Sequence, residues 1–456
     1  MSFTAVILAA GQSKRMVSPK TKVLHEILGD PSLLWVLRAI PKEVKNTVIV
    51  VNKNHDEIKR SIKIWEENKL FKTKIYFAVQ SAPKGTSDAL LSAKPLIDKL
   101  KANNVLILSA DAPLITESNL SKLIKNCPSL GISEVVDPRG YGRVFIEKSG
   151  FNLVSIVEDQ DATEAQYVHK VINSGFYALS WKTLLPFLKL VKNTNKQKEL
   201  YLTDAINSLA KGLKIKSIRF GLEEISGLNT RADLSLLHDY AKKKINNAWL
   251  KQGVSILDPS NTFIGPRVKI GTDVLIEPNV SLIGAVSIGT GSKIQTGSRI
   301  EDSKLGNFTI VRPYTLIDRS VLTNHVIVGP FSRLREGTEL ADHVQIGNFV
   351  ETKKAKISEG TKANHLTYLG DVSIGTNSNI GAGVITCNYD GVNKHKTIIG
   401  NNVFIGSDTQ MIAPIRVGDG ALVAAGTTVT EDVPRHHKAK SRVPQVNRPM
   451  NKAKNK

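Results

Sequence analysis

The order of apolar and polar residues changes character near residue 253. Before this point, short apolar runs such as residues 3–10 (FTAVILAA) and 104–111 (NVLILSAD) alternate with segments that are apolar at helical spacing, such as residues 55–68. Continuous apolar strands that alternate with helices are typical of a parallel sheet with helices on both faces. We therefore predict an α/β domain over residues 1–230, with ligands bound beyond the carboxyl ends of its strands.

A single amphipathic helix is predicted over residues 231–252. Its apolar positions, Leu234, Leu237, Ala241, Ile245 and Trp249, follow one another at steps of three or four residues. This spacing places them on one side of a helix, which should end near the glycine at position 253. We expect it to serve as a structural linker between the two halves of the chain.

From residue 253 onward an aliphatic residue returns at every sixth position, with a few slips of phase. The first run is Ile264, Ile270, Ile276, Leu282, Ile288, Ile294 and Ile300, followed by Leu305, Val311 and Ile317, by Val328, Leu334, Leu340 and Ile346, and by Ile399, Ile405, Met411, Val417, Val423 and Val429. A period of six fits neither an isolated helix nor a flat sheet. It predicts a hexapeptide-repeat parallel β-helix over residues 253–456, with each aliphatic side chain inside a narrow prism.

Composition and charge narrow the classes of function. The net charge is +21, but lysines are spread along the whole chain and only the last stretch, from residue 435, is a basic run. We therefore consider nucleic-acid binding unlikely and expect phosphate-bearing substrates instead. The two cysteines, Cys127 and Cys387, are too few for a disulfide framework. No apolar run approaches the roughly 18 residues of a membrane span, and the N-terminus reads as a buried strand. A cytoplasmic protein is expected.

Two stretches in the first half carry candidate chemistry. Residues 8–16 (LAAGQSKRM) follow the first strand with a turn of small residues, which could approach the phosphates of a nucleotide, with Lys14, Arg15 and Lys22 supplying charge. A plain strand-to-helix turn is the alternative. Asp111 ends an apolar strand, where a carboxylate can hold Mg²⁺ against a diphosphate, or can simply cap a helix.

Together these motifs resemble the sugar-1-phosphate nucleotidyltransferases, above all the bifunctional uridyltransferase/acetyltransferases that make UDP-N-acetylglucosamine. Further matches are DPRGYGR (137–143), IVEDQDAT (156–163), INSGF (172–176), YLTDAI (201–206) and GLNTRADL (227–234). The resemblance implies that UTP contacts Leu8, Ala9, Ala10, Gly11, Gln80, Gly85 and Thr86, with Lys22 neutralising its phosphates. It also implies that Gly142, Glu158 and Asn173 hold the sugar and that Asp111 and Asn229 hold Mg²⁺.

The chain departs from this family's pattern at several positions of the first half. Ser13 and Lys14 stand in place of a glycine and a threonine, Thr21 replaces a proline, and Ala110 replaces the glycine before the metal-binding aspartate. Ser87 and Asp88 follow Gly85 and Thr86. A serine in a glycine position would be strained if the backbone there had a positive φ. We expect uridyl transfer to be retained, and an acetyltransferase with impaired uridyl transfer is an alternative.

In the second half, the stretch KANHLTYLGD (362–371) interrupts the six-residue period. Forming an amide from an amine and a thioester needs a base, and the histidine in this stretch, His365, titrates near neutrality. A lone histidine is more often structural, but here arginine, lysine, tyrosine and asparagine recur within a few coils. Residues 328–433 resemble the acetyltransferase half of the same family. The resemblance implies His365 as general base, Arg335 and Lys353 on the sugar phosphate, and Tyr368 and Asn379 on the sugar.

The same resemblance implies further contacts, with Asn388 and Tyr389 at the reacting groups and Ala382, Ser407, Ala425 and Arg442 on acetyl-CoA. Asn364 departs from the family's glycine before the histidine. By resemblance, the β-helix is left-handed with three hexapeptides per turn, and the protein is a homotrimer whose acetyl-transfer sites lie between neighbouring prisms. Two other functions stay open at this point, a nucleotidyltransferase with a regulatory β-helix and a non-catalytic scaffold that binds nucleotide sugars.

Overall fold

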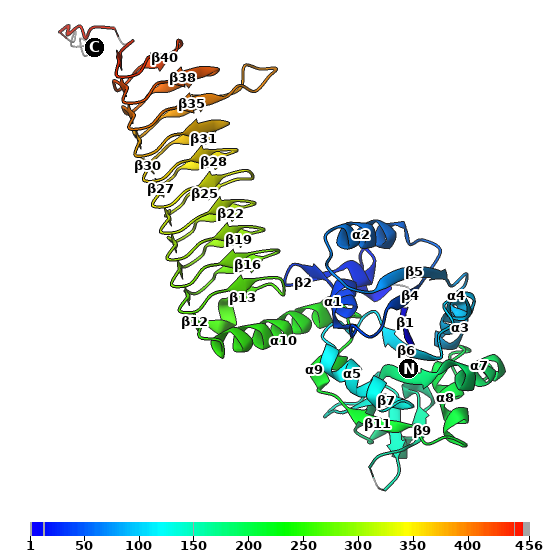
Figure 1. Ribbon diagram of the computed structural model, residues 1–456. Helices are drawn as coiled ribbons and strands as arrows, with labels where there is room; N and C mark the ends of the chain where they lie inside the picture. The colour runs from blue at the N-terminus through cyan, green and yellow to red at the C-terminus, as the bar shows by residue number, and fades with distance from the viewer. Residues whose placement is uncertain (1, 12–13, 149, 442, 450–456) are drawn as a thin grey trace, which may run out of the picture. The chain divides into compact units, whose positions relative to one another are not determined.

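A computed structural model describes residues 2–11, 14–148, 150–441 and 443–449. The chain divides into two compact units, residues 1–241 and 242–456, and the division falls within helix α10 (Arg231–Leu250). Each unit has its own hydrophobic core and is described by itself (Figure 1). Along the described residues, no helix is long and apolar enough to cross a membrane.

A mixed β-sheet forms the centre of the first unit, with the strand order β11-β7-β10-β6-β1-β4-β5. The strands are β1 (Phe3–Leu8), β4 (Asn46–Val51), β5 (Lys74–Val79), β6 (Asn104–Ser109), β7 (Ser129–Glu134), β10 (Val171–Ser180) and β11 (Lys216–Arg219), with β8 (Arg143–Ile146) and β9 (Leu153–Val157) paired beside β10. A short hairpin joins β2 (Glu26–Ile27) and β3 (Asp30–Pro31).

The sheet is mixed, so the prediction of a parallel sheet is wrong where β10 and the pair β8–β9 enter it. Strands β6, β1, β4 and β5 are parallel, as are β7 and β11, but β10 runs antiparallel to both of its neighbours. The antiparallel pair β8–β9 and the short helix α6 lie between β7 and β10 in sequence, and β10 then enters the sheet in the opposite direction to β7. An apolar run does not reveal the direction of its strand, so the sequence pattern could not show this.

Helices cover both faces of this sheet, as the sequence predicted. Along β1, Ala5 and Ile7 belong to one core while Val6 belongs to the other, because successive side chains of a strand point to opposite faces. Helices α1, α2 and α5 contribute to the first core and α3, α4, α7 and α8 to the second. The helices are α1 (Ser32–Ala39), α2 (Asp56–Glu67), α3 (Thr86–Ser92), α4 (Lys94–Lys99), α5 (Glu117–Lys125), α6 (Glu164–Tyr167), α7 (Trp181–Leu190), α8 (Leu202–Ala210) and α9 (Leu222–Ile225).

The second unit consists of three parallel sheets, which we call its first, second and third faces. The first face contains β12 (Ser255–Ile256), β15 (Leu275–Ile276), β18 (Lys293–Ile294), β21 (Ile310–Val311), β24 (Ile327–Val328), β27 (Gln345–Asn348), β30 (Lys362–His365), β33 (Asn379–Ile380), β36 (Phe404–Ile405), β39 (Leu422–Val423) and β41 (Lys438–Ala439). The second contains β13 (Phe263–Ile264), β16 (Ser281–Ile283), β19 (Arg299–Glu301), β22 (Leu316–Asp318), β25 (Arg333–Leu334), β28 (Glu351–Lys353), β31 (Tyr368–Gly370), β34 (Ile385–Cys387), β37 (Gln410–Ile412) and β40 (Thr428–Val429). The third contains β14 (Lys269–Ile270), β17 (Ser287–Ile288), β20 (Lys304–Leu305), β23 (Val321–Leu322), β26 (Glu339–Leu340), β29 (Lys356–Ile357), β32 (Val372–Ile374), β35 (Thr397–Ile399) and β38 (Ile415–Val417).

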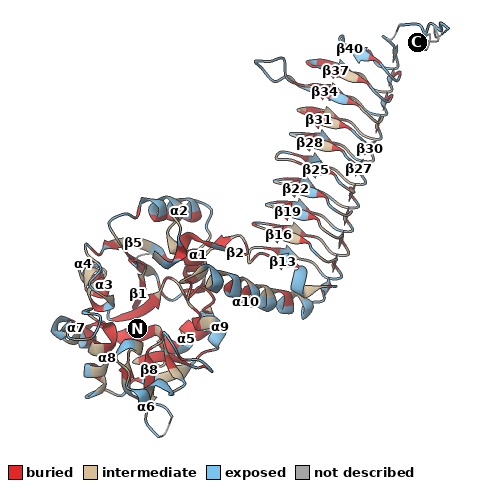
Figure 2. Ribbon diagram, turned by 180° about the vertical axis from the view of Figure 1, so that it is seen from behind, coloured by how far each residue is buried: buried red, intermediate tan, exposed pale blue. Residues whose placement is uncertain are grey.

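From β12 to β37, each strand pairs with the third strand after it, so three strands make one coil. Ile276 pairs in register with Ile294, and the aliphatic residues at every sixth position lie buried in one continuous core. Ile270 is only partly buried but packs against the same core. Figure 2 shows the buried residues in red along the strands. This is the arrangement typical of a left-handed parallel β-helix, and it confirms the predicted fold.

Candidate active sites

A cavity of about 500 Å³ lies beyond the carboxyl ends of β1 and β6 in the first unit. Its walls also come from the loops before α3, from β10 and from the start of α8. Most of the residues that the sequence nominated for the uridyl-transfer site line this one cavity, namely Leu8, Ala9, Ala10, Gly11, Lys22, Gln80, Gly85, Thr86, Asp111, Glu158 and Asn173. Gly142 and Asn229 are not among the lining residues, but each contacts one that is.

Lys22 draws the proposed metal-binding residues together. Its Nζ lies 2.5 Å from Asp111 Oδ2 and 3.1 Å from Asn229 Oδ1. The other Asp111 oxygen accepts a hydrogen bond from Ser109 Oγ at 2.5 Å. The backbone N–H of Leu228 donates to the carbonyl of Asp111 at 2.7 Å, which brings Asn229 beside the aspartate. Asp111 does not cap helix α5, whose N-cap is Thr116.

The oxygens around Lys22 suit a magnesium ion. Asp and Asn side-chain oxygens are ligands of Mg²⁺, which proteins commonly bind through one or two carboxylates plus substrate phosphates. No group of three or more His, Cys, Asp or Glu side chains within the described residues is placed to hold a metal ion. A metal at Asp111 and Asn229 would therefore draw its remaining ligands from a bound nucleotide and from water.

The loop before α3 is fixed by contacts with the chain near Leu200. Gln80 Nε2 donates to the carbonyl of Gly85 at 3.1 Å and to Asp88 Oδ2 at 2.9 Å. Gly85 has a φ of +120°, and a Cβ there would lie 2.5 Å from the carbonyl oxygen of Leu200. Asp88, one of the departures from the family pattern, thus anchors the Gln80 side chain in this chain.

The opposite wall of the cavity presents Glu158 and Asn173. Thr203 Oγ1 donates to Glu158 Oε1 at 2.7 Å, and burial raises the pKa of the Glu158 carboxyl. A Cβ at Gly142 would lie 3.3 Å from Glu158 Oε2, so the glycine leaves room for this carboxyl. Asn173 donates from its backbone N–H to Gly142 at 2.8 Å and from Nδ2 to the Tyr177 hydroxyl at 2.6 Å.

The departures from the family pattern have different structural consequences. Ala110 is buried and is not among the described residues with positive φ, so the exchange of glycine for alanine needs no strained backbone there. Thr21 lines the cavity. Ser13 lies outside the described residues, as does Arg442 of the second unit.

In the second unit, the corner between the first and second faces carries four of the predicted site residues. The strand register pairs Asn348 with His365. The same register, continued through the following coils of the first face, aligns Ala382, Ser407 and Ala425 with these two residues. We call these five residues the corner column. Each is followed by a residue whose φ lies between +45° and +73°, namely Phe349, Leu366, Gly383, Asp408 and Gly426. Three of the residues predicted to contact acetyl-CoA therefore share one edge of the prism with the candidate base.

His365 is exposed at this corner. Its Nδ1 lies 3.0 Å from Asn348 Oδ1, one coil earlier. The exposed ring is accessible to a ligand lying along the corner column. Asn348 was not singled out from the sequence, because it lies 17 residues before His365 and only the coil length of the β-helix brings the two together.

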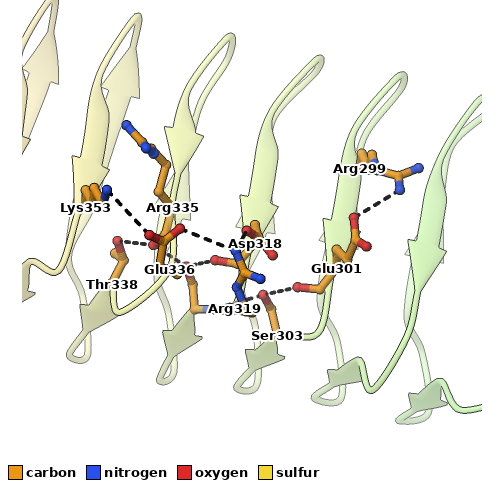
Figure 3. A network of polar contacts seen from close by, with 10 residues as sticks. Arg299, Glu301, Ser303, Asp318, Arg319, Arg335, Glu336, Thr338 and Lys353 are labelled. Carbon is orange, nitrogen blue, oxygen red and sulfur yellow. Dashed lines mark hydrogen bonds and ion pairs between the residues drawn. The ribbon is translucent and has the colours of Figure 1, made fainter. Parts of the chain in front are cut away.

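Arg335 and Lys353 occupy the far ends of β25 and β28 on the second face. The register of these strands places them in neighbouring coils. Arg335 Nη1 lies 2.8 Å from Glu351 Oε1. Figure 3 shows Lys353 reaching toward Glu336, where its Nζ lies 3.5 Å from Oε1. Arg319 contacts the other oxygen of Glu336 at 3.4 Å. A groove of about 290 Å³ lined by Arg299, Arg319, Arg333 and Arg335 lies over the same face.

The remaining predicted residues lie on neighbouring strands. Tyr368 is in register with Glu351, and its hydroxyl lies over Gly370, where a Cβ would come within 2.5 Å. Asn388 Nδ2 donates to Asp371 Oδ2 at 2.5 Å, and the exposed Tyr389 follows it in a hairpin between β34 and β35. Asn379 belongs to β33, on the first face. Glu351, Glu336 and Asp371 are carboxylate partners that the sequence interpretation did not assign.

Comparison with known proteins identifies the family of this chain. A MobA-like NTP transferase domain model matches residues 5–162, a GMPPB C-terminal domain model matches 258–364, and a hexapeptide repeat of succinyl-transferase matches 396–431. The bifunctional protein GlmU of Pelobacter propionicus is 42% identical over 452 residues, covering 97% of this chain and 96% of that protein. GlmU of Geotalea uraniireducens is 40% identical over 455 residues, covering 98% of each. The chain belongs to the GlmU family.

Membership of the GlmU family establishes both activities. The GlmU-family chain transfers an acetyl group from acetyl-CoA to glucosamine-1-phosphate and a uridylyl group from UTP to N-acetylglucosamine-1-phosphate, and so makes UDP-N-acetylglucosamine. Family membership excludes the two alternative functions, a non-catalytic scaffold and a nucleotidyltransferase with a regulatory β-helix. Among solved structures, UDP-glucose pyrophosphorylase complexed with UDP-glucose aligns with 54% of this chain and 100% of that one, at 19% identity and a TM-score of 0.44.

Proposed function

We propose that the two transfers use separate sites, uridyl transfer in the domain of residues 1–230 and acetyl transfer in the β-helix of residues 253–456, with residues 231–252 as the linker. The gathering of the nominated residues around one cavity supports the first assignment. The corner column with His365 at its centre supports the second. The product of acetyl transfer is then the sugar substrate of uridyl transfer.

In uridyl transfer, a phosphate oxygen of N-acetylglucosamine-1-phosphate attacks the α-phosphorus of UTP and pyrophosphate leaves. Leu8, Ala9, Ala10, Gly11, Gln80, Gly85 and Thr86 hold the nucleotide, and Gly142, Glu158 and Asn173 hold the sugar. Lys22 neutralises the phosphates, which requires its ammonium to exchange part of its contact with Asp111 for phosphate oxygens. Positioning and charge neutralisation are sufficient for this chemistry. Mg²⁺ held by Asp111 and Asn229 would supply further positive charge at the diphosphate.

In acetyl transfer, His365 removes a proton from the amine of glucosamine-1-phosphate as its nitrogen attacks the thioester carbonyl. Arg335 and Lys353 hold the sugar phosphate, while Tyr368 and Asn379 hold the sugar. Asn388 and Tyr389 position the reacting groups. Ala382, Ser407, Ala425 and Arg442 hold acetyl-CoA. The protein works as a cytoplasmic homotrimer in which neighbouring chains complete each acetyl-transfer site.

Substitutions in the two units should separate the two activities in one preparation. We expect His365→Ala to reduce CoA release with glucosamine-1-phosphate to a small residual rate while leaving pyrophosphate release from UTP near the wild-type rate. Asp111→Asn should do the reverse and lower uridyl transfer by about 100-fold or more, because it removes charge that holds Lys22 and the metal.

Chelation supplies an independent test of the metal. Removal of divalent cations should stop uridyl transfer, added Mg²⁺ should restore it, and acetyl transfer should be unaffected. Pyrophosphate release at the wild-type rate by the Asp111 variant would refute the assignment of this site. Equal loss of both activities in the His365 variant would show that the substitution disturbs the fold and does not simply remove a general base.

A further inference from the structure

Asn348 extends the corner column by one coil beyond the candidate base. His365, Ala382, Ser407 and Ala425 hold equivalent positions in successive coils, and Asn348 holds that position in the preceding coil. The backbone N–H of Leu366 donates to the carbonyl of Asn348 at 3.1 Å, which fixes the two neighbouring coils against each other at this corner. The side chain of Asn348 is therefore held on the edge of the prism that carries the base.

The hydrogen bond between the two side chains decides which nitrogen of His365 carries the proton. Asn348 Oδ1 lies 3.0 Å from His365 Nδ1. A carbonyl oxygen can only accept, so Nδ1 must be the protonated nitrogen of the neutral ring, and Nε2 then holds the free lone pair. A base must present a lone pair to its substrate, so this tautomer is the one that can take a proton.

Few other groups near His365 can influence the protonation state of its imidazole ring. The strands on either side of β30 are β27 (Gln345–Asn348) and β33 (Asn379–Ile380), and neither carries a titratable side chain. On β30 itself the charged residue is Lys362, three positions before the histidine. The residue that follows, Leu366, is apolar. Within this part of the described chain, the amide of Asn348 is the polar partner of the imidazole.

We propose that Asn348 is a positioning residue for acetyl transfer, which accepts the Nδ1–H of His365 and leaves Nε2 as the proton acceptor. The inference rests on the proposed role of His365 as general base. As the amine nitrogen bonds to the acetyl carbon, its proton passes to Nε2. The carbon–sulfur bond of the thioester then breaks, and the proton passes from Nε2 to the departing sulfur to give CoA as a free thiol. Asn348 itself neither gains nor loses a proton.

Substitutions of Asn348 in the full-length protein test this role. We expect Asn348→Ala to lower kcat for acetyl transfer by about 10- to 100-fold, the usual effect of losing the group that orients a functional histidine, with little change in the KM values of either substrate. Gln345→Ala is a matched control, because it removes an amide from the same strand at a position paired with Lys362 rather than with His365. The control should keep the wild-type kcat. Uridyl transfer, measured on the same samples, should be unchanged in both.

The pH profile gives a readout that a merely structural role would not move. In Asn348→Asp, an anionic acceptor beside Nδ1 favours the imidazolium, so the acid limb of kcat/KM for acetyl transfer should shift to higher pH. An unshifted profile in this variant, or wild-type kcat in Asn348→Ala, would overturn the proposal. A large rise in KM without loss of kcat would instead assign Asn348 to substrate binding.

A double substitution separates failure of this inference from failure of the proposed base. If Asn348 acts through His365, adding Asn348→Ala to His365→Ala should cause no further loss, because the two residues act as one unit. A further tenfold loss in the double variant would show that Asn348 acts independently. Wild-type acetyl transfer by His365→Ala alone would reject the base, and with it the premise of the proposal.

Discussion

The carboxyl of Glu158 lies in the wall of the cavity proposed for uridyl transfer, where the Thr203 hydroxyl donates to it at 2.7 Å. Burial raises the pKa of this carboxyl, and the charges of Asp204 and Asp161 raise it further against the opposing effect of the Thr203 hydrogen bond. A carboxylate accepts stronger hydrogen bonds than a neutral carboxyl, but the side chain proposed to hold the sugar lies where ionisation is disfavoured. We therefore expect the ionised Glu158 side chain to lower the stability of the folded protein while it contributes to sugar binding.

We expect Glu158→Gln to make the protein more stable at neutral pH. Because the pKa of Glu158 is raised in the folded state, folding favours the protonated form, and its stabilising contribution is lost as pH rises through the folded-state pKa. The glutamine has no such loss, so the melting temperature should rise by roughly 2–4 °C at neutral pH, the shift that about 1 kcal/mol gives in a domain of this size. Thermal melts across pH measure it.

The difference between the two proteins should shrink as the pH falls toward the ordinary glutamate pKa of about 4.3, where the wild-type side chain is protonated as well. Uridyl transfer by the variant should show a raised KM for N-acetylglucosamine-1-phosphate, because an amide is a weaker acceptor than a carboxylate. A stability difference that is constant across pH would contradict this account of Glu158.

Single residues could be predicted from the sequence where a motif carried them, but their partners could not. Asp111 and Asn229 were nominated together for Mg²⁺ and Lys22 for the phosphates, but the contact of the Lys22 ammonium with both oxygens emerged only in three dimensions. Asp88 looked like a defect in a motif and proves to anchor Gln80. Such partners depend on side-chain directions and loop paths, which neither composition nor spacing encodes.

At the scale of elements, the six-residue period specified the β-helix because each aliphatic residue had to face one narrow core. The six-residue period did not reveal the contact between Asn348 and His365. Side chains of neighbouring coils that touch are separated by one full coil, here 17 residues, and not by one hexapeptide. In the first unit, continuous apolar runs predicted strands buried on both faces. They could not distinguish the antiparallel β10 from its parallel neighbours.

The close packing of coils predicts the effect of one glycine substitution. A Cβ at Gly347 would lie 1.9 Å from the carbonyl oxygen of Asn364, so Gly347→Ala must push β27 away from β30. Asn348 and His365 end these two strands, and the hydrogen bond between them should be broken. We expect acetyl transfer to fall by at least the 10- to 100-fold given above for Asn348→Ala, with uridyl transfer retained.

Activity assays of both transfers on one preparation measure this effect. Gly212→Ala is a control for the substitution of glycine by alanine, because a Cβ at position 212 meets nothing within 4 Å. Wild-type acetyl transfer in Gly347→Ala would show that the distance between these two coils does not govern the site.

At the scale of the whole molecule, each unit has a core of its own and carries the residues proposed for one transfer. The candidate acetyl-transfer residues of one chain are themselves divided between two edges of the prism. His365 and the acetyl-CoA contacts follow the corner column, while Arg335, Lys353 and Asn388 lie at the far ends of the strands of the second face. This division is what a site completed by a neighbouring chain would require, and it leads to a test that needs no structure of the trimer.

Two inactive variants should restore each other when they are expressed together. The family resemblance implies that Arg442 serves the site of a neighbouring chain. In the proposed trimer a site then takes His365 from one chain and Arg442 from its neighbour, so His365→Ala and Arg442→Ala trimers should each lack or nearly lack acetyl transfer. In randomly mixed trimers, about a quarter of the sites combine an intact His365 with an intact Arg442, and CoA release should recover toward that fraction. Mixing the purified homotrimers without exchange of chains should restore nothing. A mixed preparation that contains both chains in one oligomer but shows no recovery would place His365 and Arg442 in the same chain's site.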